Sequence, residues 1–309
     1  MPHIQTLTFF NNQIREVHDH AFFTLELLES LDLSHNKIVS LDKNTFQRNK
    51  LIRTIDLSHN HLHSINGLFS NLKSLSEDNN IEFIENKTFI YLKKLKYLDL
   101  SNNKLVKLNN ETFYNLVSLE ELHLASNNIK ITFNQLTWDD IMHLEIPGLS
   151  PGAFSKLNML TLLDLSCNRL DNIPRERLQG LYNVRSINIS QNNLRELEEF
   201  APDLRNLQKL DLSLNHITRL TKDVFHGLTT LTELYLNGNW ISVITADAFH
   251  GLKKIAFIDL SHNYLETVQL KVFRYLETQV KSLSLNGELK YYLNILRLTL
   301  NCHNCRDNV

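Results

Sequence analysis

The sequence predicts a repetitive α/β solenoid, in which short parallel strands form a sheet on one face and irregular or short helical segments return behind them. Two observations predict it. The phrase Leu-x-Leu-x-x-Asn-x-(Leu/Ile) recurs along the 309 residues, mostly 24 residues apart, and 58 residues are Leu and 36 are Asn. A fixed period of this length is typical of chains built from stacked supersecondary units.

Each Leu-x-Leu segment is expected to form a short strand, because its apolar residues alternate with polar ones. Leu31 and Leu33 would point inward while Asp32 points to solvent. Successive strands run in the same direction, so they must pair in parallel, and the rest of each repeat must return behind the sheet.

The repeated Asn sets the phase of the repeats. Its copies are Asn12, Asn36, Asn60, Asn79, Asn103, Asn127, Asn168, Asn192, Asn215, Asn239 and Asn263. The spacing of 41 residues before Asn168 is expected to hide one more copy, whose apolar slots are filled by Trp138, Ile141, Leu144, Ile146 and Leu149. With a further strand at Leu283 and Leu285, residues 1–301 would hold about 13 repeats.

Each repeated Asn is expected to satisfy backbone groups that lose their sheet partners where the chain bends, since its amide both donates and accepts hydrogen bonds. Replacing Asn103 with Ala should cost about 1–3 kcal/mol. A second column of aromatic residues, in a common phase with the Asn, is expected to fill the core: Phe22, Phe46, Phe89, Phe113, Phe154, Phe225, Phe249 and Phe273.

These features resemble the typical 24-residue subfamily of extracellular leucine-rich repeat proteins, which includes Toll-like receptor ectodomains and chaoptin-like adhesion proteins. The resemblance covers residues 4–301. It implies a curved right-handed solenoid with its parallel sheet on the concave side. It also implies a binding module from a secreted or cell-surface recognition protein, in immunity or in adhesion, that takes a protein or glycan ligand and is compatible with homo- or heterodimers.

The two ends of the chain bear on this resemblance. Repeat-phase residues begin already at Ile4, without a polar cap or a visible signal peptide, so we expect either a fragment of a longer protein or an incomplete gene model. Residues 302–309 resemble the start of the family's C-terminal cysteine flank, which makes Cys302 and Cys305 disulfide candidates. In the competing interpretation, the lack of a visible signal peptide and the three thiols indicate an intracellular protein. This interpretation predicts a scaffold for protein–protein interaction.

Composition and motifs argue against several other functions. The 32 basic and 34 acidic residues form no basic run, so no nucleic-acid-binding surface is expected, and no apolar run is long enough to span a membrane. No catalytic or cofactor-binding motif is present, so we expect no enzyme and no cofactor. His59, His61 and His63 alternate and would form either a metal or pH-sensing cluster or ordinary surface scatter.

The solvent-facing strand positions supply the candidates for partner binding. Seven of the eleven residues that stand four positions before the Asn position are acidic. This indicates either a cationic partner or simply the consensus sequence of the repeat. Repeats that depart from this consensus place large side chains at the solvent-facing strand positions. Aromatic residues of this kind are favoured at binding hot spots. The candidate partner-binding residues are His123, Asp211, Tyr235, Trp240, Phe257, Asp259 and Tyr264.

Four of these candidates, Tyr235, Phe257, Trp240 and Tyr264, are expected to form one aromatic cluster that binds a partner. Tyr235 and Phe257 occupy exposed slots of adjacent repeats, and Trp240 and Tyr264 should lie about 5 Å apart, one strand spacing. The alternative is that these rings only extend the packing of the repeats.

Glycosylation sequons occur at Asn86, Asn110 and Asn188, a number that chance alone explains. Asn188 falls on a strand, where a glycan would obstruct the sheet face. Asn86 and Asn110 lie away from the strands and are therefore the better candidate acceptors.

Overall fold

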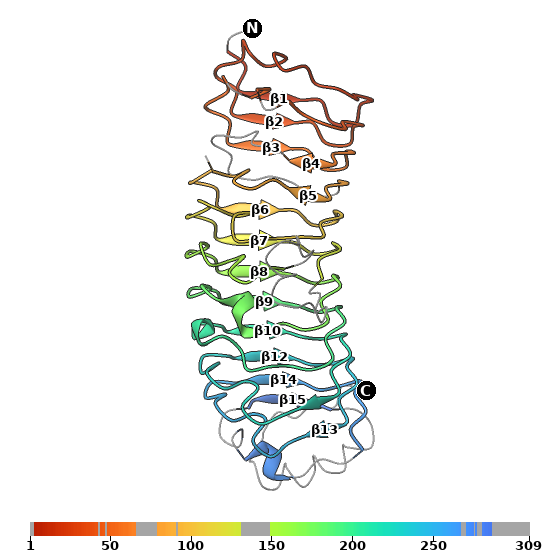
Figure 1. Cartoon of the computed structure of the whole chain (residues 1–309), viewed down its shortest axis with the longest axis vertical. Helices are drawn as coiled ribbons and strands as arrows, with labels where there is room; N and C mark the ends of the chain where they lie inside the picture. The colour runs from red at the N-terminus through yellow and green to blue at the C-terminus, as the bar shows by residue number, and fades with distance from the viewer. Residues whose placement is uncertain are drawn as a thin grey trace, which may run out of the picture. The chain divides into compact units, whose positions relative to one another are not determined.

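The computed structural model describes residues 3–42, 44–46, 48–65, 79–90, 92–130, 149–266, 270–274, 276 and 280–285. The chain divides into two compact units, Met1–Asp164 and Leu165–Val309, which are described separately. In each unit the strands follow one another in chain order and run in parallel (Figure 1). The predicted parallel-strand leucine-rich repeat solenoid is confirmed.

The first unit contains two runs of three-residue strands. In one of them Leu7, Leu31 and Ile55 lie in register, and in the other Leu98, Leu122 and Leu163 do. The strands are β1 (Thr6–Thr8), β2 (Ser30–Asp32) and β3 (Thr54–Asp56), then β6 (Tyr97–Asp99), β7 (Glu121–His123) and β8 (Leu162–Asp164). Two shorter strands pair in parallel, β4 (Ser64–Ile65) and β5 (Phe83–Ile84).

The second unit repeats the plan. Its main strands are β9 (Ser186–Asn188), β10 (Lys209–Asp211), β12 (Glu233–Tyr235), β14 (Phe257–Asp259) and β15 (Ser282–Ser284), paired in that order. On the return side lie a short parallel pair, β11 (Arg219–Leu220) and β13 (Val243–Ile244), and three 3-10 helices: η1 (Arg175–Leu178), η2 (Pro202–Leu204) and η3 (Leu270–Phe273). β15 confirms the strand predicted at Leu283.

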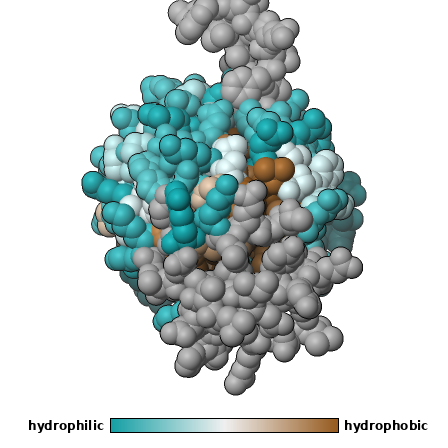
Figure 2. Space-filling view, turned by 90° about the horizontal axis from the view of Figure 1, so that it is seen from below, coloured by the Kyte–Doolittle hydropathy of each residue, from teal (hydrophilic) through white to brown (hydrophobic). Residues whose placement is uncertain are grey.

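The core lies between the strands and the returns. The central Leu or Ile of every main strand but the outermost ones, Leu7 and Leu283, is buried. The eight predicted Phe residues are also buried, and the stacked rings lie mostly 6.1 to 6.3 Å apart. Phe200 joins this stack 6.3 Å from Phe225, although it is out of phase with the Asn repeat. In Figure 2, hydrophilic side chains form the visible rim and the visible hydrophobic ones lie nearer the centre.

The repeated Asn side chains connect successive coils, as Asn192 shows. Its amide nitrogen donates to the carbonyls of Ile189 and Ser190 in its own coil and of Leu165 in the preceding one, at 3.0–3.1 Å. Its amide oxygen accepts the N–H of Leu170 at 3.0 Å. The same oxygen contact, to the residue two positions after the preceding Asn, recurs along the chain at Asn36, Asn60, Asn79, Asn103, Asn127, Asn215, Asn239 and Asn263.

The extra coil predicted between Asn127 and Asn168 is wrong. β7 pairs directly with β8, with His123 opposite Asp164, and a strand has only two edges, so no strand can lie between them. The rings of Phe113 and Phe154 also stack directly, 6.1 Å apart. β8 therefore follows β7 directly in the sheet, and Leu149 rejoins the regular pattern by a parallel bridge to Leu108.

Where the structure describes it, the residue before the repeated Asn adopts a left-handed backbone conformation, which sequence reasoning missed. His35, His59, Ser126, Gln191 and His262 all have φ between 52° and 55°. In one coil this position is Gly238, with φ of 68°, where a Cβ atom would lie 2.6 Å from Leu214 Cδ2. Glycine therefore suits the backbone there, and the exposed Leu214 side chain would have to move to make room for any larger residue.

Several expectations lie outside the described residues. They are the Trp138 to Ile146 segment and the candidate disulfide cysteines Cys302 and Cys305. In the part of the chain that is described, no helix has the length and apolarity needed to cross a bilayer.

Replacing Asn192 with Ala should lower the free energy of unfolding by about 1–3 kcal/mol, because buried backbone groups of two coils lose their partners. Denaturant unfolding followed by circular dichroism measures this change. The control is Asn193→Ala, which alters the exposed neighbouring residue and should change the stability by about 0.5 kcal/mol or less. Equal effects of the two substitutions would contradict the bridging role of Asn192.

Candidate functional site

The solvent-facing side chains of β10, β12 and β14 form a compact group in the second unit. We call this group the strand-face patch: Lys209, Asp211, Glu233, Tyr235, Phe257 and Asp259. Strand pairing fixes its rows, because Lys209, Glu233 and Phe257 lie opposite one another, as do Asp211, Tyr235 and Asp259. All of these side chains alternate with buried Leu or Ile residues of the same strands.

Tyr235 is the centre of the patch. Its ring lies 5.1 Å from the ring of Phe257, tilted by 46°, and Lys209 Nζ lies 5.0 Å from its centroid. Its hydroxyl donates to Glu233 Oε2 at 3.1 Å. The expected contact between Tyr235 and Phe257 is thus present, and both rings are half-buried, which leaves part of each available to a partner.

The electrostatic environment of Tyr235 is acidic. Partial burial raises the pKa of its phenol above the ordinary value of 10.0, and the hydrogen bond to Glu233 and the charges of Glu233, Asp211 and Asp259 raise this pKa further. Lys209 is the only basic residue among the three acidic ones of the patch. The phenol therefore stays a hydrogen-bond donor in a negatively charged setting.

The acidic residues of the strand face also have a structural role. Asp32, Asp56, Asp99, Asp211 and Asp259 each accept, through Oδ1, the backbone N–H of the residue two positions later, at 2.9 Å. In three of these coils the same oxygen also accepts the Ser hydroxyl. The recurrent Leu-Asp-Leu-Ser motif is therefore explained by a turn at the end of each strand, and no binding partner is needed to account for it.

The other aromatic candidates lie apart from the patch. Trp240 stacks on His216 of the preceding coil, with ring centroids 4.3 Å apart, and Tyr264 is 66% exposed. Within the described residues, no ring contact links Trp240 or Tyr264 to the pair formed by Tyr235 and Phe257. The four rings do not form one cluster by direct contact.

His123 belongs to the first unit and has its own neighbours. Its ring lies 5.1 Å from that of Tyr97, and its Nε2 lies 3.4 Å from Glu121 Oε2. Tyr97 in turn donates to Asp99 at 3.1 Å. This arrangement resembles the one around Tyr235, with a carboxylate and an aromatic ring on adjacent strands.

Sequence reasoning missed two histidine contacts. The rings of His35 and His59 stack 4.0 Å apart, since both occupy the left-handed position before the repeated Asn. On the return side of the second unit, Asp223, His226 and His250 bring three potential ligand atoms within 4.8 Å of one another. The motif Phe-His-Gly-Leu, which occurs at 225–228 and again at 249–252, could have predicted that His226 and His250 lie close together.

The comparisons with known proteins agree on one family. A profile described as leucine rich repeat matches the chain in overlapping windows that together cover residues 2–129 and 140–288. Lumican from Gallus gallus is 33% identical over 171 residues, which are 52% of this chain and 49% of that protein. Chaoptin from Drosophila melanogaster is 32% identical over 172 residues, which are 54% of this chain and 12% of that protein.

A longer match comes from Toll-like receptor 3 of Bos taurus, which is 28% identical over 263 residues, or 74% of this chain and 26% of the receptor. The chain thus spans half or less of the length of these relatives. Their activities and partners belong to longer proteins.

Solved structures share the fold. The mouse RP105/MD-1 complex aligns with a TM-score of 0.75 at 23% identity, over 94% of this chain and 48% of that one. The Drosophila Toll–Spatzle complex aligns with 0.70 at 22%, over 94% and 40%. The TLR13–ssRNA13 complex aligns with 0.66 at 22%, over 90% and 42%. This last protein binds RNA, but identity at this level shows the fold alone, so the absence of nucleic-acid binding stays a prediction for this chain.

Replacing Glu233 with Gln should lower the pKa of Tyr235, because a negative charge next to the phenol is removed. The titration is followed by absorbance at alkaline pH, as the difference between each protein and its Tyr235→Phe counterpart. Glu198→Gln, on an exposed return residue, is the matched control and should leave the titration unchanged. An unchanged Tyr235 titration in Glu233→Gln would contradict the described coupling.

Proposed function

The chain belongs to the leucine-rich repeat family, and on that premise we propose that it is a protein-binding recognition module of a secreted or cell-surface protein, in immunity or in adhesion. In this proposal the strand-face patch of the second unit is the contact surface, and binding occurs without catalysis. The single observation that carries the proposal is the pair formed by Tyr235 and Phe257, placed side by side on the solvent face of the strands.

The chemistry of the pair supports a contact role. Its two rings are held by a rigid sheet and are only half-buried, so covering them would bury apolar area at little cost in conformational entropy. The Tyr235 hydroxyl and the surrounding carboxylates add hydrogen-bonding groups at the edge. Aromatic residues with such surroundings are enriched among binding hot spots.

The charge of the patch selects the kind of partner. Three carboxylates, from Asp211, Glu233 and Asp259, face one amine from Lys209, which itself lies 3.8 Å from Glu233. A basic protein surface would complement this balance, and an Arg or Lys side chain would find the two rings within cation–π range. A protein partner with an exposed basic segment therefore fits better than an acidic one.

The proposed extracellular location is supported by the location of the similar proteins and by the sequence of the 24-residue repeat. Lumican, chaoptin and Toll-like receptor 3 are extracellular or cell-surface proteins. The alternative, an intracellular scaffold, uses the same binding surface in another compartment. The modification state of the natural protein distinguishes the two.

The double substitution Tyr235→Ala with Phe257→Ala should weaken partner binding by about thirtyfold or more, corresponding to about 2 kcal/mol for a hot spot. The partner is first identified by screening immobilised ectodomains of secreted and cell-surface proteins, with a glycan array and single-stranded RNA in parallel. Surface plasmon resonance then measures the affinity of each variant.

The control is Tyr182→Ala, which removes an exposed ring from a return of the same unit and should leave the affinity unchanged. A folded double variant that binds like the unmodified protein would refute the patch. Binding to glycans or RNA alone would refute the protein partner, and a patch occupied by a second copy of the chain would show in the oligomeric state.

Asn86 and Asn110 should carry N-linked glycans when the protein is made from its natural gene in its own cells. Both residues are exposed, whereas Asn188 is half-buried on β9, where its Oδ1 accepts the N–H of Ser190 at 3.0 Å. Glycopeptide mass spectrometry measures the occupancy of each site. Bare Asn86 and Asn110 together with reduced cysteines would favour the intracellular scaffold.

A further inference from the structure

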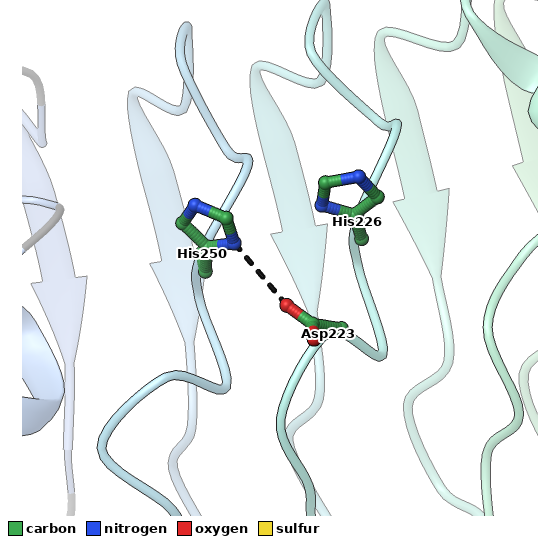
Figure 3. Close-up of side chains that lie close together, drawn as sticks. All are labelled: Asp223, His226 and His250. Atoms are coloured by element: carbon green, nitrogen blue, oxygen red, sulfur yellow. Dashed lines mark hydrogen bonds and ion pairs between the residues drawn. The ribbon is translucent and has the colours of Figure 1, made fainter.

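Three side chains of types that can ligate a metal lie close together on the return side of the second unit, outside the strand-face patch. Asp223, His226 and His250 come from two successive returns and point toward one another (Figure 3). His250 Nδ1 lies 3.2 Å from Asp223 Oδ1, and the rings of His226 and His250 stack with centroids 5.5 Å apart. Asp223 and His250 are half-buried, and His226 is exposed.

The repeat brings these residues together. His226 and His250 stand 24 residues apart in the same phase, each directly after a stacked core ring, Phe225 or Phe249. Each imidazole also ends a turn, in which the His226 N–H donates to the Asp223 carbonyl at 2.8 Å and the His250 N–H donates to Asp247 at 3.0 Å. The backbone that carries the three side chains is therefore fixed by the core.

The next coil shows what distinguishes this group. There Asp247 pairs with Arg274, which has the same separation of 27 residues as Asp223 and His250. The acidic column thus contacts the basic residue of the following return in both cases. Only the first contact supplies imidazoles instead of a guanidinium, and an imidazole can coordinate a metal whereas a guanidinium cannot.

The distances suit a small divalent ion. Ligand atoms about 2.0–2.1 Å from a tetrahedral zinc ion lie about 3.3–3.4 Å from one another. The contact of 3.2 Å between His250 and Asp223 already has this spacing, and all three ligand atoms lie within 4.8 Å of one another. Small side-chain rotations of the exposed His226 would close the remaining difference. Lys222 Nζ lies 3.7 Å from Asp223 Oδ2, whereas the other carboxylate oxygen, Oδ1, contacts His250.

We propose that Asp223, His226 and His250 bind a divalent transition-metal ion, with zinc as the reference ion and water in the fourth position. Two imidazoles and one carboxylate are a ligand set that zinc takes in proteins. The ion would link two successive returns and replace the direct contact between Asp223 and His250. This proposal is independent of the function proposed for the strand-face patch.

The test is isothermal titration calorimetry of zinc chloride into the full chain, after treatment with a chelator, combined with cobalt substitution. The double variant His226→Gln with His250→Gln should lose one zinc equivalent or bind it at least about tenfold more weakly. The visible absorption of tetrahedral cobalt should disappear with it. The variant Asp223→Asn, which preserves the size of the side chain, should weaken binding in the same direction.

The matched control is His35→Gln with His59→Gln, which removes another stacked histidine pair from the chain. These two histidines lie in the first unit and are not part of the proposed site, so the control should leave the zinc titration and the cobalt spectrum unchanged. Zinc binding that is unaffected in both the His226/His250 and the Asp223 variants would overturn the proposal. An equal loss in the control variant would overturn it as well, because binding would then follow histidine content instead of this site.

Discussion

The buried asparagine side chain is the interaction on which the rest of the structure depends. Its amide oxygen accepts the backbone N–H of the Leu or Ile two positions after the preceding Asn, as in the contact from Leu194 to Asn215 at 3.0 Å. Its amide nitrogen donates to carbonyls of its own coil and of the preceding one. Backbone hydrogen bonds between coils continue past the strands, as from the Leu214 N–H to the Asn237 carbonyl, but the buried N–H of Leu194 donates to the side chain of Asn215. Without this side chain, that N–H would be buried without a partner.

Because the coils are held in this phase, every position of the repeat becomes a column. Residues 24 apart then lie one strand spacing apart, whatever their chemistry. This rule places Tyr235 opposite Asp211 and Asp259 on the strand face, stacks Phe225 on Phe249 in the core, and sets His226 against His250 on the returns. The scaffold is uniform, and the proposed binding sites arise where the residues of one column differ from the consensus sequence of the repeat.

Periodicity was sufficient to predict the main strands, the buried Leu and Phe columns and the contact of Tyr235 with Phe257, but not the short strands β4, β5, β11 and β13. It failed between Asn127 and Asn168, where apolar residues match the repeat in sequence although β7 pairs directly with β8. It could not predict the stacking of Trp240 on His216, which depends on the rotamer of one ring. The contact of Asp223 with His250 also escaped, because it joins different positions of two repeats.

Hydrogen exchange measured by nuclear magnetic resonance at single amides tests the central claim most directly. The amides of Ile38, Leu105, Leu170, Leu194, Ile217 and Ile241 donate to an asparagine oxygen of the next coil. The account predicts that these amides exchange as slowly as those of the adjacent strands. Exchange at the rate of unprotected peptide amides, in a folded chain, would show that the asparagine side chains do not hold the coils together.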